Sequence, residues 1–242
     1  FSSIYKFDKK YLLIKNFNRV KFIFQNPNDI KFFAELVNTK PHNKLFNLIP
    51  GSGVPDRYFS SVKVYSRNYK NNFDFIYCAR LIKSKGIELF IKLSSHFRKS
   101  KFFVYGELDV NSEDYLSNDE ISFYKNQNQN LLFMDHKKDP LLNHHNDQSI
   151  FIIPSMYGEG LPRAILEAMS LEIPVVASEK SCVGLFDKKN LFVVEDNNLN
   201  SYINVISEIK YKKHTDDFNK FLRMAKENVR KKYKESKIVG DT

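Results

Sequence analysis

The sequence predicts an α/β fold in which helices cover both faces of a parallel sheet. Two observations support this prediction. Short apolar runs of strand length alternate along the chain with segments of helix length that carry one apolar stripe. Some of these runs, such as residues 150–153, are continuously apolar, as expected for strands that are buried on both faces. Strands separated by helices of this size pair in parallel, because a parallel crossover needs a long connection.

Composition excludes several other classes of protein. The chain has 242 residues, of which 42% are hydrophobic and 14% aromatic, and it is therefore too apolar to be disordered. Eight Gly and eight Pro exclude a collagen-like or low-complexity chain, and two cysteines are too few for a secreted disulfide scaffold. No apolar run approaches the roughly 20 residues that cross a bilayer, and the N-terminus lacks a signal-peptide pattern. We therefore expect a soluble, cytoplasmic chain with one large domain or two small ones.

The first part of the chain predicts a strand, a helix and a second strand. Residues 22–24 and 46–49 have the short apolar pattern of strands, and a helix opens at Pro27 between them. A Gly-Ser-Gly turn ends the second strand, and it is either a plain turn, a domain exit or the lining of a cleft. Residues 56–72 are polar and aromatic without a clear period, so we expect them to connect two domains. The apolar stripe of the helix consists of Ile30, Phe33, Leu36 and Val37.

A regular series of strands and helices follows this connection and predicts a second domain. The expected strands are residues 73–78, 102–105, 131–134, 150–153, 174–177 and 191–194. The expected helices are residues 85–97, 112–124, 162–171, 200–209 and 216–233. The last helix has an apolar face made of Phe218, Phe221, Leu222, Ala225 and Val229.

Ligands of parallel α/β sheets bind outside the carboxyl ends of the strands, so functional residues should follow strands directly. Arg80 and Lys85 lie five residues apart between the strand at 73–78 and the following helix. Two cations beside a helix N-terminus suit a diphosphate, because the helix end adds free N–H groups and a positive dipole. An arginine can also donate to two phosphate oxygens at once.

A second segment of this kind follows the strand at 150–153. Gly158 and Gly160 would let the backbone approach a ligand closely, and Glu159 lies between them. Glu167 lies within the next helix among apolar residues, and a buried carboxylate needs a partner, such as the hydroxyls of a ribose. From spacing alone an equally good alternative is that Glu167 faces solvent and Glu159 is an acid at a helix start.

Together these segments resemble the retaining glycosyltransferases of family 4, which have the two-domain GT-B fold. Arg80, Lys85 and Gly86 match the family's Arg/Lys element, and Glu159 and Glu167 match its Glu-x7-Glu element. The strings Gly-Glu-Gly-Leu-Pro-Arg and Leu-Glu-Ala-Met are close to those of capsule, exopolysaccharide and O-antigen transferases. The resemblance covers roughly residues 20 to 233.

The resemblance implies a role for each of these residues. Arg80 and Lys85 would bind the diphosphate of a UDP- or GDP-linked sugar, Glu167 would hold the ribose, and Glu159 would contact the transferred sugar. The implied catalytic residues are Glu159, Arg80 and Lys85, and Gly158, Gly160, Leu161 and Glu167 complete the implied donor site. The implied enzyme has no cofactor and no bound metal. Its acceptor would be a glycan or a lipid-linked glycan.

The resemblance also implies a domain organisation. Residues 1–55 would be the remnant of an N-terminal acceptor-binding domain, and residues 56–72 the connection. Residues 73–215 would be the donor-binding domain, a Rossmann-like parallel sheet, and residues 216–242 a helix that crosses back, with a tail. Residue 1 is Phe rather than Met, so we expect most of the acceptor domain to precede it. The net charge of the chain is +10, and similar enzymes use lipid-linked acceptors. We therefore expect the chain to bind peripherally to the inner face of the membrane.

Three other functions remain open at this point. A nucleotide-binding module without catalysis of its own, and a nucleotide-sugar epimerase of similar fold, would share these motifs. A basic nucleic-acid-binding protein would explain the positive cluster Arg230–Lys232, but no nucleic-acid-binding signature accompanies it, and we expect no nucleic acid as partner. The adjacent His144 and His145 do not share a helix face, so we expect no metal site with Asp147.

Overall fold

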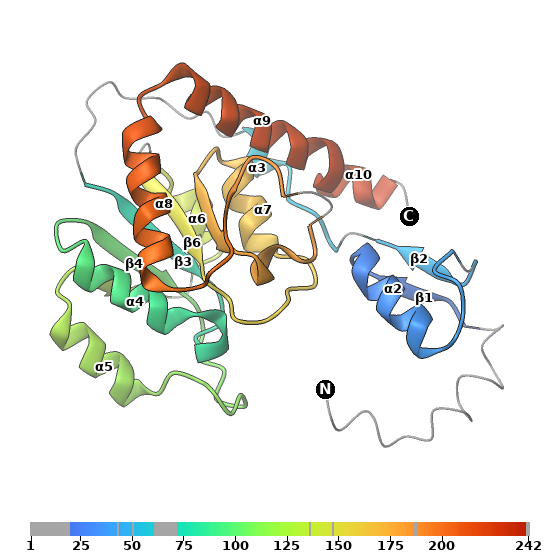
Figure 1. The fold of residues 1–242 in the computed structure, drawn as a ribbon, viewed down its shortest axis with the longest axis horizontal. Helices are drawn as coiled ribbons and strands as arrows, with labels where there is room; N and C mark the ends of the chain where they lie inside the picture. The colour runs from blue at the N-terminus through green and yellow to red at the C-terminus, as the bar shows by residue number, and fades with distance from the viewer. Residues whose placement is uncertain are drawn as a thin grey trace.

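The computed structural model describes residues 20–42, 44–49, 51–60, 72–135, 137–146, 148–185 and 188–240, with the backbone alone at 239 and 240. These residues form a small N-terminal unit and a larger domain (Figure 1). Predictions that concern residues 1–19, Pro50, 61–71, Asp147 and 241–242 lie outside the described residues. Among the described residues, no helix is long and apolar enough to cross a membrane.

The N-terminal unit has the predicted strand–helix–strand order. It consists of β1 (Phe22–Phe24), α2 (Pro27–Leu36) and β2 (Phe46–Leu48), and the two strands pair in parallel. Phe33 of α2 packs against Phe22 and Phe46, with ring centroids 4.8 and 5.8 Å apart. Ile23 points to the opposite face of this small sheet and is 66% exposed.

The larger domain is built on a six-stranded sheet in which every pair of neighbouring strands is parallel. In spatial order the strands are β5 (Leu131–Phe133), β4 (Lys101–Tyr105), β3 (Asp74–Cys78), β6 (Ser149–Ile153), β7 (Val175–Ser178) and β8 (Phe192–Val194). β3 is the first of these strands in the chain and pairs with both β4 and β6. The strand order therefore reverses between β3 and β6, as it does in dinucleotide-binding folds.

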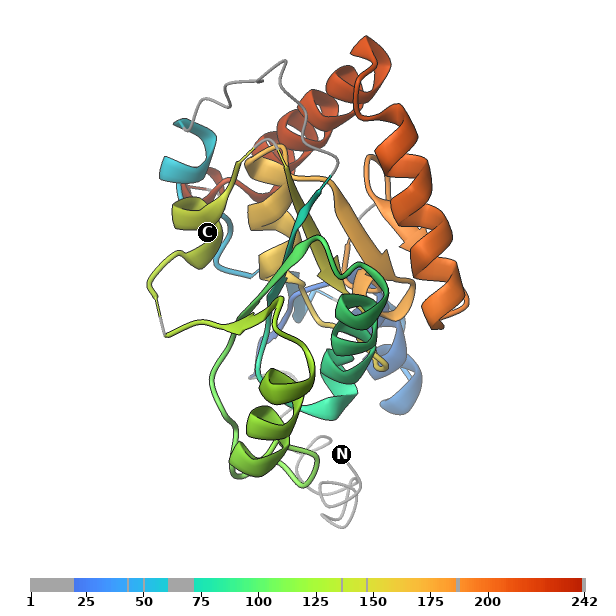
Figure 2. The ribbon, with the colours of Figure 1, turned by 90° about the vertical axis from the view of Figure 1, so that its left-hand side faces the viewer.

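Helices cover both faces of this sheet, which confirms the predicted fold class. Figure 2 shows α4 (Ile87–His96) and α8 (Leu199–Lys212) on one side, and α6 (Pro140–His144) and α7 (Arg163–Ser170) on the other. Tyr77 of β3 packs on Phe90 of α4, with ring centroids 5.5 Å apart. All five residues of β6 are buried, which explains the continuously apolar sequence of residues 150–153.

The end of the chain returns to the segment that leaves the N-terminal unit. α9 (Asp216–Tyr233) packs along α7 and continues into α10 (Glu235–Gly240) (Figure 1). The N–H of Val54 donates to the carbonyl oxygen of Tyr233 (2.7 Å), and the N–H of Glu235 donates to the carbonyl oxygen of Val54 (2.9 Å). Of the five residues predicted for the apolar face of α9, Phe221 is half-buried and the other four are buried: Phe218, Leu222, Ala225 and Val229.

Two predicted helices begin later than expected. α4 begins at Ile87, because Lys83–Lys85 form a 3-10 turn and Gly86 takes a left-handed conformation with φ of +78°. α5 (Asn118–Gln127) begins six residues after the predicted start at 112. Ser117 and Glu120 form a capping box that fixes this start. The loop before it is as polar as the helix, so the sequence pattern did not show where the helix begins.

Besides α10, which lies in the expected tail, two short helices were not predicted. α3 (Arg57–Ser60) lies within the expected connection, and it buries Tyr58 and Phe59. α6 follows Asp139, whose φ is +56°. Both helices are too short to show a helical period, so the sequence pattern could not reveal them.

We predict that Gly86→Ala lowers the free energy of unfolding by at least about 2 kcal/mol. A Cβ atom at Gly86 would lie 2.0 Å from the carbonyl oxygen of Pro154, and the left-handed φ adds strain. Urea unfolding measures the change. Gly158→Ala is the matched control, because its Cβ would meet only Val183 at 4.0 Å. Equal stability of the two variants would contradict the prediction.

Candidate functional site

The two segments predicted to carry chemistry lie side by side where the strand order reverses. The first follows β3 and the second follows β6, so both leave the carboxyl ends of neighbouring strands. The N–H of Met156 donates to the carbonyl oxygen of Ser84 (2.8 Å), which fixes the two loops against each other. The close approach of Gly86 to Pro154 gives a second contact. This is the position at which ligands bind in such sheets.

Lys85 and Glu159 meet in this crevice, although 74 residues separate them. The ammonium of Lys85 donates to both carboxylate oxygens of Glu159 at 2.5 Å. Their side chains are only 11% and 16% exposed. The Lys85 ammonium also lies 4.5 Å from the ring centroid of Tyr157, in a cation–π contact. An ion pair removed from water in this way costs desolvation energy, and such pairs are more often functional than stabilising.

Arg80 does not join this pair. Its side chain is 57% exposed and donates to Asp109 at 2.6 Å. The hydrogen bond to Asp109, and a second one to the Tyr157 hydroxyl, raise the pKa of the Arg80 guanidinium. Tyr157 therefore contacts both predicted cations. The sequence offered no signal for this role beyond the position of Tyr157 in the loop after β6.

Glu167 is buried, so the alternative in which it faces solvent is wrong. It is 7% exposed and accepts a hydrogen bond from Nε of Arg163 (2.8 Å). Burial raises the pKa of the Glu167 carboxyl, and the Arg163 hydrogen bond only partly offsets this rise. Cys78, at the end of β3, has a pKa raised to about 12 by burial and then by the nearby Glu167 charge.

A group of residues beside Glu167 escaped the sequence analysis. Arg57 donates from two nitrogens to Asp139 (3.0 and 2.8 Å), and the hydroxyl of Tyr58 donates to the same carboxylate (3.2 Å). Tyr58 is fully buried, and its hydroxyl also lies close enough to Glu167 to lower the pKa of that carboxyl. These side chains come from α3 and from the turn before α6, the two helices that showed no sequence signal.

The glycine loop between β6 and α7 is held from both sides. The carbonyl oxygen of Gly160 accepts from Nδ2 of Asn26 (3.0 Å), and Gly51 lies against the Leu161 side chain. A Cβ atom on Gly184 would come within 1.5 Å of the same Gly160 oxygen. Among the described residues, no side chain caps the N-terminus of α7, but the N–H groups of Arg163 and Ile165 already donate to the carbonyl oxygens of Leu161 (2.9 Å) and Pro162 (3.0 Å).

The adjacent histidines 144 and 145, considered above as metal ligands, are not part of this crevice. His144 hydrogen bonds through Nδ1 to the hydroxyl of Tyr105 (2.8 Å) and packs on Phe103. Burial lowers the pKa of its imidazole. His145 contacts the carbonyl oxygen of Leu142 through Nδ1. In the described part of the chain, no three His, Cys, Asp or Glu residues gather as metal ligands.

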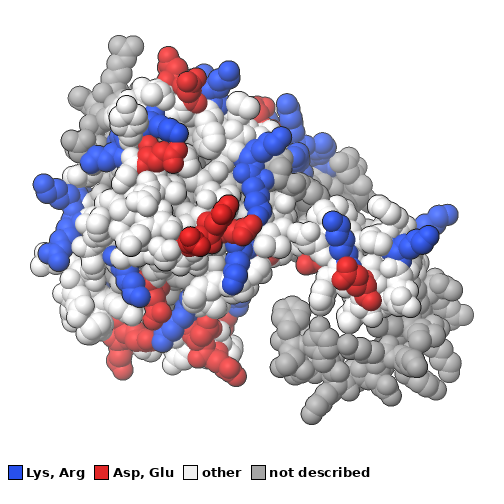
Figure 3. All heavy atoms as spheres, viewed as in Figure 1, with Lys and Arg blue, Asp and Glu red and all other residues white. Residues whose placement is uncertain are grey.

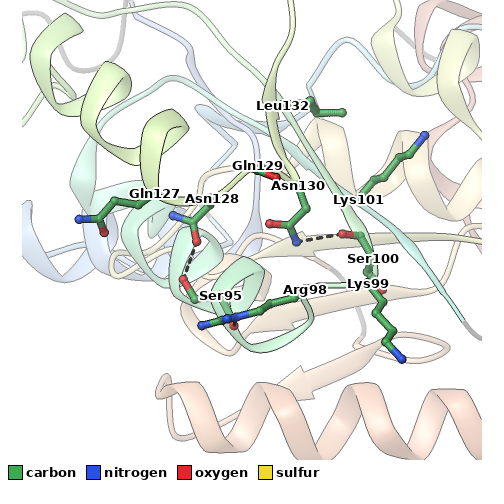
Figure 4. Close-up of a pocket in the computed structure, with 10 residues that line it drawn as sticks. All are labelled: Ser95, Arg98, Lys99, Ser100, Lys101, Gln127, Asn128, Gln129, Asn130 and Leu132. Atoms are coloured by element: carbon green, nitrogen blue, oxygen red, sulfur yellow. Dashed lines mark hydrogen bonds between the residues drawn. The ribbon is translucent and has the colours of Figure 1, made fainter.

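A cavity of about 810 Å³ lies elsewhere, at the amino ends of β4 and β5 (Figure 4). Its two asparagines already have partners within the protein. Asn130 donates to three carbonyl oxygens at the end of α4 and the start of β4, and Asn128 accepts from Ser95 (2.6 Å). These bonds close helix ends, and the groove holds no acid–base or buried charged group. We therefore place the candidate site at the carboxyl ends of β3 and β6.

Comparison with known proteins shows the family to which the chain belongs. Residues 62–232 match the family described as "Glycosyl transferases group 1". The chain belongs to this family. It is 28% identical over 123 residues to an uncharacterized glycosyltransferase of Methanocaldococcus jannaschii, which covers 48% of this chain and 28% of the relative. It is 27% identical over 168 residues to the UDP-Gal:alpha-D-GlcNAc-diphosphoundecaprenol alpha-1,3-galactosyltransferase of Escherichia coli, which covers 67% of this chain and 41% of that enzyme.

Solved structures share the fold at low sequence identity. A glycosyltransferase of Rickettsia africae superposes with a TM-score of 0.75 at 16% identity, covering 96% of this chain and 63% of its own. HepE of Anabaena, solved with UDP and glucose, superposes with a TM-score of 0.70 at 18% identity. The match covers 90% of this chain and 60% of the HepE chain. The chain thus spans less than two thirds of each of these relatives and neighbours. These similarities confirm the GT-B-type α/β fold.

We predict that Glu167→Gln is more stable than the wild-type chain at neutral pH. Because the folded-state pKa of Glu167 is raised above its ordinary 4.5, its ionisation opposes folding once the pH exceeds that range. The advantage of the variant should therefore grow as pH rises from about 4 to about 7, and urea unfolding across this range measures it. Glu208→Gln is the control, because Glu208 is exposed beside Lys212. A constant difference at all pH values would refute the prediction.

Proposed function

We propose that this chain carries the donor site of a retaining glycosyltransferase that acts in surface polysaccharide synthesis. The enzyme would move a sugar from a nucleotide-sugar donor to a glycan or lipid-linked acceptor. The observation that carries the proposal is the convergence of Lys85, Glu159 and the buried Glu167 at the switch point of the sheet. Membership of the glycosyl transferases group 1 family supports it.

Positive charge at the crevice suits the diphosphate of the donor. Lys85 and Arg80 come from the loop after β3, and the N-terminus of α7, with its positive dipole, follows the glycine loop after β6. Together they would offset the charge that develops on the departing diphosphate, so we propose that the reaction needs no bound metal. Arg80 is held by Asp109 at the crevice rim, where it can turn toward a phosphate without first being desolvated.

Glu167 suits the ribose of the nucleotide. Its carboxylate accepts a hydrogen bond from Arg163, and a carboxylate can accept two further hydrogen bonds from a diol. The raised pKa of this carboxyl means that the folded chain retains a costly buried group, as binding sites often do.

Glu159 and the backbone of Gly158, Gly160 and Leu161 would contact the transferred sugar. In a retaining reaction, the acceptor hydroxyl attacks the anomeric carbon from the side of the leaving group. The bond between this carbon and the phosphate oxygen breaks, and the departing phosphate takes the hydroxyl proton. Glu159 lies within contact of Lys85, so sugar and diphosphate would be bound by neighbouring side chains.

The acceptor and the complete enzyme are part of the proposal. The name of the Escherichia coli relative specifies UDP-Gal and a diphosphoundecaprenol-linked acceptor, which supports a UDP- or GDP-linked donor and a lipid-linked acceptor here. We propose that an acceptor-binding domain completes the active site. The exposed Ile23 on a sheet of only two strands supports this, since such small sheets need further packing to be stable.

The alternatives differ in how they are supported. The partial coverage of its relatives' length supports a second candidate, a nucleotide-binding module without catalysis of its own. An epimerase of similar fold would form free or epimerised sugar without an acceptor, so product analysis separates it. Figure 3 shows Lys and Arg scattered over one face among Asp and Glu rather than gathered in one patch, which gives no support to a nucleic-acid surface there. Peripheral membrane binding stays a prediction, which anionic liposomes can test.

We predict that the chain binds UDP or GDP at submillimolar concentration and that Lys85→Met weakens this binding roughly 10- to 100-fold, the usual value of a charge-assisted hydrogen bond. Isothermal titration calorimetry measures the dissociation constant. Lys212→Met is the control, because this exposed lysine pairs with Glu208 on α8, away from the crevice. The donor-site proposal fails if neither nucleotide binds the wild-type chain at millimolar concentration.

We predict that Glu159→Gln binds UDP more tightly than the wild-type chain, by roughly fivefold for a difference of about 1 kcal/mol. In the free protein the Lys85 ammonium is paired with the Glu159 carboxylate. A diphosphate that binds Lys85 therefore has to displace this carboxylate. The same variant should transfer sugar more slowly once an acceptor domain is supplied. Weaker UDP binding would show that Glu159 supports the diphosphate rather than competing with it.

A further inference from the structure

Asn26 lies between the N-terminal unit and the candidate site, and it is 1% exposed. Its Oδ1 accepts from the backbone N–H groups of Asn28 and Asp29, both at 3.0 Å, and so caps the N-terminus of α2. Its Nδ2 donates to Oδ2 of Asp29 (2.7 Å) and to the carbonyl oxygen of Gly160 (3.0 Å). The amide thus uses both of its donors and accepts twice, which fixes its orientation.

Further contacts strengthen this link across the molecule. Nδ2 of Asn28 donates to the carbonyl oxygen of Val183 (2.9 Å), and Oε1 of Gln25 lies 3.3 Å from where a Cβ of Gly160 would be. On the other side of the loop, Gly184 packs directly on Gly160. The glycine loop is therefore enclosed between the start of α2 and the turn at 183–184.

The loop needs such support because its own sequence does not define its shape. Glycines at 158 and 160 give the backbone more conformational freedom than other residues would, and a ligand that orders them has to overcome that entropy. A hydrogen bond to the Gly160 carbonyl fixes the peptide that follows Glu159 and leads into α7. The N–H of Glu159 is itself bonded to the carbonyl oxygen of Lys180 (3.3 Å).

We propose that Asn26 is a positioning residue that holds the loop 158–161 in the conformation that receives the donor sugar. The proposal rests on the proposed function for the identity of the ligand. Asn26 itself touches no substrate. It acts through the Gly160 carbonyl, so it orders the loop before the ligand arrives and lowers the entropy lost on binding. Because the cationic contacts to the diphosphate, Lys85 and Arg80, lie on the β3 side of the crevice, Asn26 should affect recognition of the sugar much more than recognition of the nucleotide.

The test uses Asn26→Ser in the 242-residue chain. A serine keeps an oxygen that caps α2 but has no Nδ2 donor for Gly160. Asn26→Asp is a second variant, which keeps the shape and the cap and loses the same donor. Asn198→Ser is the matched control, because Asn198 caps α8 by accepting from the N–H of Ser201 and does not contact the loop.

The first measurement is amide hydrogen exchange in peptides that cover residues 156–162, without any ligand. We expect faster exchange in both Asn26 variants and no change in the Asn198 control. Unchanged exchange in the Asn26 variants would overturn the proposal. This readout does not depend on nucleotide binding, so it remains decisive even if the proposed function is wrong.

The second measurement compares UDP with UDP-glucose and UDP-galactose by calorimetry. We expect the affinity for UDP to change less than about twofold in the Asn26 variants and the affinity for the preferred UDP-sugar to fall roughly tenfold. An equal loss for UDP and UDP-sugar would indicate a structural role only and would overturn the proposal. If the wild-type chain binds none of the three, the proposed function fails, and the exchange result alone decides the role of Asn26.

Discussion

The reversal of strand order between β3 and β6 is the constraint on which the site depends. β3 pairs with β4 on one side and with β6 on the other, so the connections after β3 and β6 leave the sheet toward opposite faces. The crevice between them brings Lys85 and Glu159 together although they lie 74 residues apart. Complete burial of β6 anchors this arrangement, because a slip in register would expose apolar side chains.

The charged groups of the crevice are held at a cost in stability. Lys85 and Glu159 are largely removed from water, and Glu167 is a buried carboxylate with a raised pKa. Each has a partner that limits this cost, Tyr157 for the lysine and Arg163 for Glu167. A chain selected for stability alone would replace such groups with apolar ones, so their presence favours a binding role for the crevice.

The N-terminal unit belongs to the site as well as to the fold. Its Asn26 contacts the glycine loop, and its exit at Val54 pairs with the backbone at the end of α9. The larger domain therefore contacts the N-terminal unit at two places. One is the glycine loop of the crevice, and the other is the end of α9. Contacts of this kind can make ligand recognition depend on a segment outside the donor-binding sheet.

The sequence by itself determined the strands, the long helices and the positions of Arg80, Lys85, Glu159 and Glu167, because apolar periodicity is local and site residues follow strands directly. The predicted helix 112–124 started six residues too early. The two residues of a capping box are hard to recognise within a segment that is polar throughout. Only the tertiary structure decided the partners: Lys85 with Glu159, Arg80 with Asp109, Tyr58 with Glu167, and Asn26 with Gly160. These pairs join segments up to 134 residues apart, and strand order, which no local pattern encodes, brings them together.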